Sequence, residues 1–464
     1  MTEAQSPAES SMGDDMIRMP SQPKTVRETG LELALIVELI AKVMYVCGKM
    51  HLPVLTGKLR LSINVLREAL GFMLAEQLVE VAARGDSDLD VSYQLTHNGR
   101  LRAADFLARC RYMGPAPVTL QAYCDVIARQ SSRHASLDRV SATSVAAAFG
   151  EDSLDPAVRD QIGAAMQSSR SMLLHGPSGS GKSMIARRLG KLQQGIVAVP
   201  CAFLAGNDIV LVYDPLLHLA PATQIRQSED RRSSDTRWVL CERPLIQVGA
   251  ELSSEMLDLR YDGAGGVYYA PPHLMANNGM LVIDDLGRQR MPSAELLNRF
   301  SAPLDTHTDH LTLHGGCKLG VPFDVTLVFA TNLPPQLLLD DSSMRRIAYK
   351  VHVGALSDTH YRALFRRQCR LSGVGCDDAV VEHLLSYLHA STGRALLAST
   401  PRELLDRLVD FARFAGIEPR LTVPALDQAW SSLFAGCPSG APAPFQPFDP
   451  FLADCGDPLL ERIS

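Results

Sequence analysis

A run of small residues that ends in lysine and serine carries the clearest chemical signal in this chain. It reads Gly176-Pro177-Ser178-Gly179-Ser180-Gly181-Lys182-Ser183, the G-x-x-x-x-G-K-S spacing that lets backbone amides surround phosphate oxygens. Glycine has no side chain and reaches positive φ, so the three glycines let a phosphate approach several N–H groups closely. Apolar residues precede the run and an amphipathic stretch comes after it, which predicts a strand, a glycine loop and a helix.

The end of this run predicts how a nucleoside triphosphate would be held. Lys182 would reach the β- and γ-phosphates, and the hydroxyl of Ser183 would ligate Mg²⁺. The N-terminus of the following helix adds partial positive charge at the same point. We therefore assign residues 176–184 to nucleotide binding, and this range includes Met184. An ordinary glycine- and serine-rich turn is the simpler alternative, which the flanking strand and helix disfavour.

A second candidate site lies about 100 residues later, where an apolar run ends in two acids. Residues 280–283 are typical of a buried parallel strand, and Asp284 and Asp285 come directly after it. Because α/β sheets bind ligands at the carboxyl ends of their strands, both carboxylates are expected beside the glycine loop. Asp284 would hold Mg²⁺ through water or through Ser183, and Asp285 would polarise the attacking water. Acids that merely cap the end of a strand are the alternative.

Together these motifs resemble the AAA+ ATPases, over about residues 155–436. The resemblance implies an α/β fold, namely a P-loop AAA+ αβα sandwich over residues 155–354 and a C-terminal α-helical lid over residues 355–436. It also assigns roles to further residues. The apolar strand 325–331 ends at Asn332, the family's sensor 1, which would orient the lytic water.

Two arginines and a lid residue complete the set implied by the resemblance. Arg345 and Arg346 fall where the family carries an arginine finger, with Arg346 as the first choice and Arg345 as the second. Such a guanidinium neutralises charge at the nucleotide of a neighbouring subunit. A solvated surface pair is the alternative. In the lid, Thr400 is expected as the N-cap of a helix with Pro401 at its first position, and Arg402 matches sensor 2.

A finer resemblance is to the enhancer-binding transcription activators, magnesium chelatase and MoxR-type ATPases. It rests on residues 265–289 and on the hairpin-like residues 309–324. Two departures limit it. The usual glutamate after the first acid is Asp285, one methylene shorter, so water would be poised less well and turnover would be slow. The activators' substrate-engaging loop signature is absent, so that activity is not carried over.

Residues 29–112 predict a winged-helix-like domain, with three helical periods followed by two strands around a polar turn at residues 85–88. Winged helices often bind DNA through the third helix. Residues 31–112, however, hold ten Lys/Arg against nine Asp/Glu, and the wing itself carries Asp86, Asp88 and Asp90. Since phosphate contacts supply most non-specific DNA affinity, docking of a protein partner is favoured and DNA binding is the alternative.

Composition is that of an ordinary soluble globular protein: 464 residues, 46% hydrophobic and 21% charged, with a net charge of −6. This charge gives no general attraction to nucleic acid or to an anionic membrane. Apolar runs are too short for a membrane span, the N-terminus is not a signal peptide, and ten scattered cysteines suit a cytoplasmic location. Residues 1–28 predict a disordered leader, and the Pro-rich residues 437–464 predict a disordered tail. Residues 113–154 predict a linker with one short helical piece around residues 120–127.

Two further stretches are interpreted as structural. Residues 195–201 predict a buried strand, and the segment from there to about Gly266 predicts an insertion. His307, His310, His314 and Cys317 are all possible zinc ligands, but His310 and His314 would lie about 13 Å apart on one predicted strand. A polar hairpin is therefore the favoured interpretation.

The sequence thus predicts an ATP hydrolase that binds Mg²⁺ and ATP and, by resemblance, assembles as a homo-oligomer, a hexameric ring. Three roles compete for what hydrolysis drives. The first is a MoxR-like chaperone role on a protein client, favoured by the acidic balance. The second is a DNA-binding or transcription-related role, favoured by the winged helix. The third is a slowly hydrolysing ATP-dependent switch, favoured by Asp285.

Overall fold

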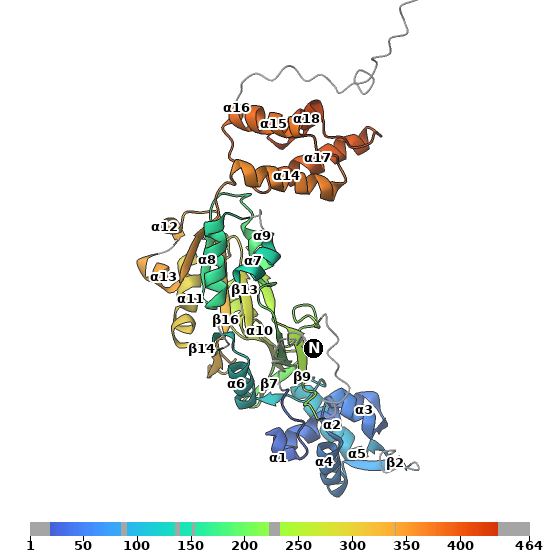
Figure 1. The fold of residues 1–464 in the computed structure, drawn as a ribbon. Coiled ribbons are helices and arrows are strands. Elements are labelled where there is room, and N and C mark those ends of the chain that lie inside the picture. The colour runs from blue at the N-terminus through green and yellow to red at the C-terminus, as the bar shows by residue number, and fades with distance from the viewer. Residues whose placement is uncertain are drawn as a thin grey trace, which may run out of the picture. The chain divides into compact units, whose positions relative to one another are not determined.

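The computed structural model describes residues 19–84, 91–134, 140–150, 154–221, 233–338 and 340–434. The chain divides into two compact units, Met1–Gly354 and Ala355–Ser464, which are coloured along the chain in Figure 1. The predicted wing turn, the predicted tail and the first 18 residues of the predicted leader lie outside the described residues.

The first unit is built on a parallel five-stranded sheet in the order β10-β13-β16-β5-β17. The strands are β5 (Met172–His175), β10 (Leu245–Val248), β13 (Gly279–Ile283), β16 (Val325–Thr331) and β17 (Tyr349–His352). β5 comes first in the chain yet lies between β16 and β17, so the strand order reverses beside it. In open parallel sheets the carboxyl ends of the strands form a ligand crevice at such a point.

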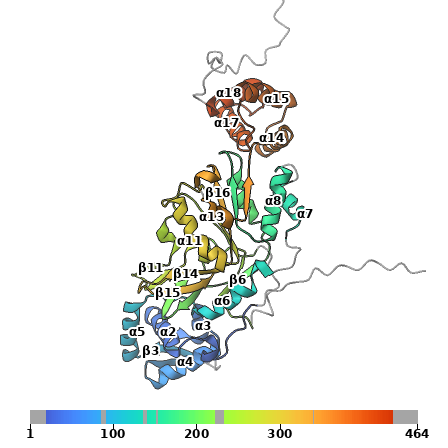
Figure 2. The same ribbon diagram turned by 90° about the vertical axis from the view of Figure 1, so that its left-hand side faces the viewer.

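Helices cover both faces of this sheet because its strands alternate between two apolar cores. Leu173 belongs to one core, whereas its neighbours Met172 and Leu174 belong to the other. The helices are α7 (Ala142–Phe149), α8 (Pro156–Gln167) and α9 (Lys182–Leu189) on one face and α11 (Ser293–Thr306) on the other. Figure 2 shows α7 and α8 on one side of β16 and α11 on the other. This α/β arrangement is consistent with the AAA+ fold that the sequence predicts.

One strand of the sheet lies inside the segment that the sequence predicts as an insertion. The buried strand predicted at residues 195–201 is present as β6 (Ile196–Pro200), which pairs antiparallel with β9 (Trp238–Glu242) in a separate two-stranded sheet. The edge of the parallel sheet is β10, from the predicted insertion. Both segments are short apolar runs, and periodicity alone does not tell which of them joins the sheet.

A second sheet, partly parallel, is formed in the order β11-β12-β8-β7-β4. Its strands are β4 (Val118–Thr119), β7 (Ala202–Ala205), β8 (Asp208–Leu211), β11 (Arg260–Asp262) and β12 (Val267–Tyr269). α6 (Leu120–Arg129) continues directly from β4, and its Tyr123 stacks on Phe203 with ring centroids 4.9 Å apart. Residues 118–129 of the predicted linker are therefore packed structure, and the short helical piece predicted around residues 120–127 is α6.

The N-terminal part is the segment from Val26 to Arg109. Its described residues form five helices and a three-stranded sheet in the order β1-β3-β2. They are α1 (Val26–Thr29), α2 (Leu33–Cys47), β1 (Met50–His51), α3 (Leu52–Leu59), α4 (Ile63–Ala75), β2 (Val79–Arg84), β3 (Val91–Leu95) and α5 (His97–Arg109). The leader prediction is corrected for residues 19–28. Val26 is buried and its amide donates to Glu68 Oε2 at 2.9 Å, so this segment packs against α4.

A buried ion pair fixes this N-terminal part to the second sheet. The guanidinium of Arg237 binds both carboxylate oxygens of Asp235, and the two side chains are 5% and 3% exposed. Another nitrogen of Arg237 donates to the carbonyl oxygens of Thr29 and Pro117. A buried pair whose donors are all used is tolerated, whereas removal of one partner is strongly destabilising. The N-terminal part is therefore held rigidly against the sheet.

The remaining elements of the first unit surround the two sheets. They are α10 (Pro272–Met275), the hairpin β14 (Thr308–Thr312) and β15 (Lys318–Pro322), α12 (Pro335–Leu338) and α13 (Asp341–Arg346). The described residues of this unit also include the short 3₁₀ turns Ser132–His134 and Ser254–Leu257.

The second unit is helical. It contains α14 (Asp358–Ser372), α15 (Asp378–His383), a π-helical segment (Leu384–His389), α16 (Ala390–Thr392), α17 (Thr400–Phe414) and α18 (Val423–Leu433). α17 begins one residue earlier than predicted, because Ser399 is its N-cap and Thr400 is its first residue. Within the described ranges, none of the helices is long and apolar enough to span a bilayer.

A buried charge cluster joins α10, α11 and β14. His273 Nε2 lies 2.7 Å from Asp309 Oδ2, and Arg299 binds both oxygens of the same carboxylate at 2.6 and 2.8 Å. Burial alone would raise the pKa of Asp309, but the hydrogen bonds from His273 and Arg299 outweigh it and hold that pKa well below its usual range. The carboxylate is thus ionised in the folded protein and serves as the common acceptor for both partners.

We predict that Asp309→Asn lowers the stability of the first unit by about 3 kcal/mol, because Arg299 and His273 lose their shared acceptor. Trp238 and Trp430 are the protein's two tryptophans. In a Trp430→Phe background, Trp238 fluorescence therefore reports urea unfolding of the first unit alone. The exposed Asp160→Asn serves as the control, with an expected change below about 0.5 kcal/mol. Equal midpoints for the two variants would contradict the prediction.

Candidate functional site

The glycine loop has a backbone shape that only glycine reaches without strain. The φ angles of Gly176, Gly179 and Gly181 are 147°, 82° and 98°. A Cβ added at Gly176 would lie 2.1 Å from the carbonyl oxygen of Val353, at the end of β17. The loop is therefore packed backbone to backbone against the neighbouring strand.

Lys182 lies at the centre of this loop and is only 6% exposed. Its Nζ donates to the carbonyl oxygens of Gly176 at 2.9 Å and Pro177 at 2.7 Å, and to Ser180 Oγ at 3.3 Å. Burial lowers the pKa of Lys182, and the charges of Asp284 and Asp285 act in the opposite direction. These two carboxylates are therefore close enough to act on the ammonium group, as the sequence predicts.

The next two residues begin α9. Ser183 is half-buried in the first turn of α9, next to the lysine. Met184 is 37% exposed, so a role for it in nucleotide binding would come from its backbone.

Asp284 has the chemistry of a magnesium ligand. Its Oδ1 accepts from the amide of Asp285 at 3.0 Å and its Oδ2 accepts from Gln247 Nε2 at 3.1 Å. A carboxylate has about four lone-pair sites, so these two bonds to the described residues leave acceptor capacity. Mg²⁺ prefers one or two carboxylates together with hydroxyl, water and phosphate oxygens. The half-buried Asp284 and Ser183 fit that preference.

Asp285 occupies the left-handed region, with φ 51°. Its Oδ1 accepts from Asn332 Nδ2 at 3.2 Å, so the predicted sensor side chain and the second acid are in direct contact. Among residues with a side chain, aspartate and asparagine enter this region more readily than longer side chains. The backbone conformation thus gives a physical reason for aspartate where the family's usual residue is glutamate.

Two glutamines outside the predicted motifs hold this turn in place. Gln289 Nε2 donates to the carbonyl oxygens of Asp284 at 2.9 Å and Asp285 at 3.2 Å, and its Oε1 accepts from Gly287 N. Gln247, on β10, is the donor to Asp284 Oδ2. Nothing in the spacing of either glutamine marks it in the sequence. The role of Gln247 depends on the pairing of β10 with β13, whereas Gln289 acts within its own turn.

Arg345 and Arg346 do not join this site, because they lie at the opposite edge of the sheet. The carbonyl of Arg346 accepts from Ser171 Oγ at 3.2 Å, at the amino end of β5. The glycine loop begins at the carboxyl end of the same strand, about 16 Å away at the rise of an extended chain. Arg346 is paired with Asp305 Oδ2 at 3.3 Å, whereas exposed Arg345 has no hydrogen-bond or ion-pair partner among the described residues.

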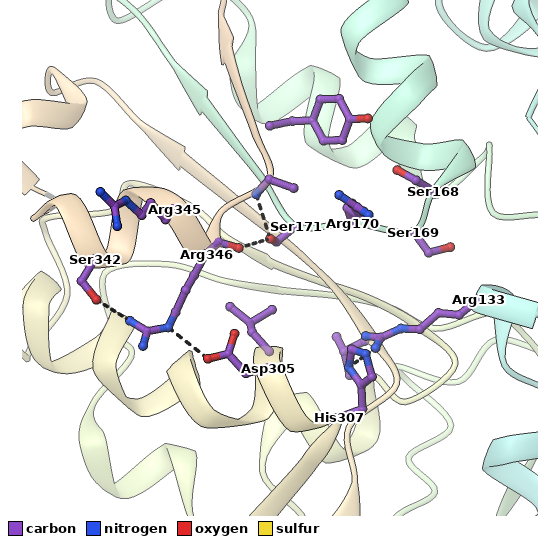
Figure 3. A pocket seen from close by; sticks show the side chains of 14 residues that line it. Arg133, Ser168, Ser169, Arg170, Ser171, Asp305, His307, Ser342, Arg345 and Arg346 are labelled. Atoms are coloured by element: carbon purple, nitrogen blue, oxygen red, sulfur yellow. Dashed lines mark hydrogen bonds and ion pairs between the residues drawn. The ribbon is translucent and has the colours of Figure 1, made fainter.

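The amino edge forms an open cleft of about 1340 Å³. Figure 3 shows Arg345 and Arg346 beside it with Arg133, Arg170 and several serines. Arg402, the predicted sensor 2, lies in the second unit, where it is 75% exposed and pairs with Asp406 at 3.4 Å. Its role stays a prediction.

The histidines of the zinc alternative lie on and beside the β14–β15 hairpin. His310 is in β14, and His314 lies beyond the end of that strand, stacked on Tyr261. The predicted hairpin is confirmed, although its first strand begins and ends two residues earlier than expected. Within the described ranges, no three His, Cys, Asp or Glu side chains gather as a metal site.

Comparisons with known proteins give limited matches. A family profile described as a domain of unknown function (DUF8689) matches residues 357–432, in the second unit. No curated protein sequence matches the chain. NtrX from Brucella abortus in complex with ATP is similar at 16% identity and a TM-score of 0.38, over 66% of this chain and 60% of that chain. The RuvB Holliday junction branch migration motor of Thermotoga maritima is similar at 15% identity and a TM-score of 0.35, over 61% of this chain and 70% of that chain.

The matched part spans between 53% and 60% of the NtrX chains. Likenesses at TM-scores below 0.5 and at such identities do not assign a function.

We predict that Gly176→Ala abolishes nucleotide binding, because the added Cβ meets the Val353 carbonyl and φ 147° is closed to alanine. Titration with a fluorescent ATP analogue measures the affinity. Gly71→Ala in α4 is the control, since a Cβ there meets nothing within 4 Å and alanine favours a helix. Unchanged affinity in Gly176→Ala, with circular dichroism like that of the wild type, would contradict the assignment.

Proposed function

We propose that this protein binds ATP with Mg²⁺ and hydrolyses it at the carboxyl edge of the parallel sheet. One observation carries the proposal: the glycine loop holds Lys182 within electrostatic reach of Asp284 and Asp285, and Asn332 binds Asp285 directly. Segments far apart in the sequence thus bring a cation, two acids and an amide to one crevice. This combination suits the binding and in-line hydrolysis of a phosphoanhydride.

Each residue has a distinct task in this proposal. The loop amides and Lys182 bind and orient the phosphates, while Ser183 and Asp284 would hold Mg²⁺, which would neutralise charge on the phosphate oxygens. Asp285 accepts a proton from water, and Asn332, bonded to Asp285, fixes where that carboxylate points. Gln289 keeps the Asp285 turn in its left-handed conformation.

The arginine finger is proposed to act on a second copy of the chain. Arg346 is held by Asp305 and Ser342, whereas Arg345 is exposed and has no partner in the described part of the chain. We therefore place Arg345 ahead of Arg346 as the finger. Both lie at the edge away from their own glycine loop, which supports action in trans and hence a homo-oligomer. The hexameric ring and a role for Arg402 as sensor 2 remain implied by resemblance only.

The work driven by ATP is proposed to be remodelling of a protein client. α4, which is the third helix predicted from the sequence, exposes two apolar side chains, Phe72 and Leu74, at 42% and 37% exposure. Glu68 of α4 accepts the Val26 amide, and Arg67 is also engaged. A helix with exposed apolar side chains and one engaged cation suits a protein surface better than a phosphate backbone. A cytoplasmic location is proposed with this role.

We predict that Lys182→Ala lowers ATP turnover at least about 100-fold, because one phosphate-stabilising cation is removed. Asp285→Asn should lower turnover by about 100- to 10,000-fold with nearly unchanged ATP affinity, since only proton acceptance is lost. Released phosphate and calorimetric titration give the two quantities, and the exposed Asp160→Asn is the control. Equal, near-zero turnover in the wild type and Lys182→Ala despite ATP binding would leave only the switch role.

We also predict that duplex DNA neither retains the protein at low salt nor stimulates its turnover. The test is a fluorescence anisotropy titration at about 50 mM salt, where phosphate contacts are stronger than at physiological salt. Stimulation by DNA would favour the transcription-related role over the chaperone role.

A protein client captured from the native host should be lost with Phe72→Asp and kept with Arg102→Ala on α5.

A further inference from the structure

The cleft at the amino edge of the parallel sheet has a composition that no motif explains. It is lined by the ends of α8, α11 and α13 and by the residues that precede β5 and β17. Four of its lining residues are arginines, and the only acid among them is Asp305. With histidine neutral, the lining therefore carries a formal excess of three positive charges.

Two of these arginines already have counter-charges. Arg133 Nε lies 3.2 Å from Asp324, and Arg346 Nε lies 3.3 Å from Asp305. Arg170 is exposed like Arg345, and neither has a hydrogen-bond or ion-pair partner within the described ranges. The uncompensated charge of the cleft thus comes from Arg170 and Arg345, which belong to different segments of the chain.

The backbone of Arg170 is fixed even though its side chain is exposed. Its amide donates to Ala165 O at 3.1 Å, and the preceding Ser169 takes the left-handed conformation with φ 48°. Ser169 Oγ is also 3.0 Å from Ser132 Oγ. On the other side, Ser171 Oγ bonds the Arg346 carbonyl. The turn that presents Arg170 is therefore tied directly to the end of α13.

Guanidinium groups in a serine-rich cleft favour a phosphate ligand. Arginine binds phosphate with two parallel hydrogen bonds, and hydroxyl groups supply further donors. Unpaired like charges in one cleft repel each other, and an anion that sits between them removes this repulsion. Figure 3 shows hydroxyl groups of Ser168, Ser169, Ser171 and Ser342 around the same opening.

We propose that Arg170 is a second cation that acts in trans: together with Arg345 it contacts the terminal phosphates of the nucleotide bound by a second copy of the chain. The inference rests on the proposed function. The chain's own nucleotide site is at the opposite end of β5, so its phosphates cannot reach this cleft. A second copy presents the same phosphates at its carboxyl edge, the surface that a head-to-tail assembly brings against an amino edge.

The test is a mixing experiment with full-length chains. Arg170→Ala keeps its own glycine loop but lacks one cleft cation, whereas Lys182→Ala lacks nucleotide turnover but keeps an intact cleft. We expect Arg170→Ala alone to lower kcat by about 10- to 100-fold, a small part of what an arginine finger contributes. Mixed with Lys182→Ala, it should regain activity beyond the sum of the two separate proteins. Arg345→Ala should behave in the same way.

Matched variants separate a contact with phosphate from a structural role. Arg170→Lys should retain part of kcat because it keeps the charge, and exposed Arg102→Ala on α5 should leave kcat at the wild-type value. If Arg170→Ala keeps the wild-type kcat, or if the activity of the mixture equals the sum of the two separate activities, the inference is wrong. The proposed ATP hydrolysis at the Lys182 site is then unaffected. If the wild type does not bind ATP, the proposed function itself is wrong.

A second readout covers the case in which ATP binds but turnover is very slow. Sedimentation velocity with a non-hydrolysable ATP analogue should show nucleotide-dependent self-association of the wild type. Arg170→Ala should require a higher protein concentration for the same association, and Arg170→Lys should lie between the two. Identical association of Arg170→Ala and the wild type, or no association of the wild type with the analogue, would overturn the inference.

Discussion

Close approach of backbone to backbone at the carboxyl edge of the parallel sheet is the constraint on which the rest of the structure depends. The carbonyl of Val353 occupies the space that a side chain at residue 176 would need, and Val353 N donates to His175 O at 2.8 Å. The loop is thus shaped by a neighbouring strand as well as by its own glycines. The same edge fixes Asp285 in the left-handed region through Gln289. The groups that we propose to bind phosphate and water are therefore held in place by the fold itself.

The sequence predicts which side chains meet at the carboxyl edge of the sheet, because their signals are local. A glycine loop between a strand and a helix, and acids or an amide directly after apolar runs, mark their places without knowledge of the fold. Gln247 could not be found in this way, since it reaches Asp284 only because β10 lies beside β13. Gln289 is close in sequence to the turn that it holds, but its spacing matches no motif. The sequence also does not show whether β6 or β10 forms the edge strand of the parallel sheet. Both are short apolar runs, and they look alike until their pairing partners are known.

The two edges of the parallel sheet are electrically different, and this asymmetry has a structural origin. The carboxyl edge gathers Asp284 and Asp285 around one lysine, whereas the amino edge gathers arginines with few acids. Because strand direction is the same in all five strands, every carboxyl terminus faces one edge and every amino terminus the other. A parallel sheet can therefore carry half of a composite site on each edge. Activity of such a protein depends on protein concentration as well as on its residues.

The ion pair of Arg237 and Asp235 has a mechanical consequence. Through the Thr29 carbonyl at the end of α1, it ties the N-terminal part to the chain just before β9, and only two residues separate β9 from β10. β10 carries Gln247, whose amide binds the carboxylate of Asp284. The N-terminal part is thus connected through these contacts to β10, the edge strand of the parallel sheet, and from β10 to the carboxylate of Asp284. β10 therefore links the ion pair to Asp284, at the edge where we propose that ATP is hydrolysed.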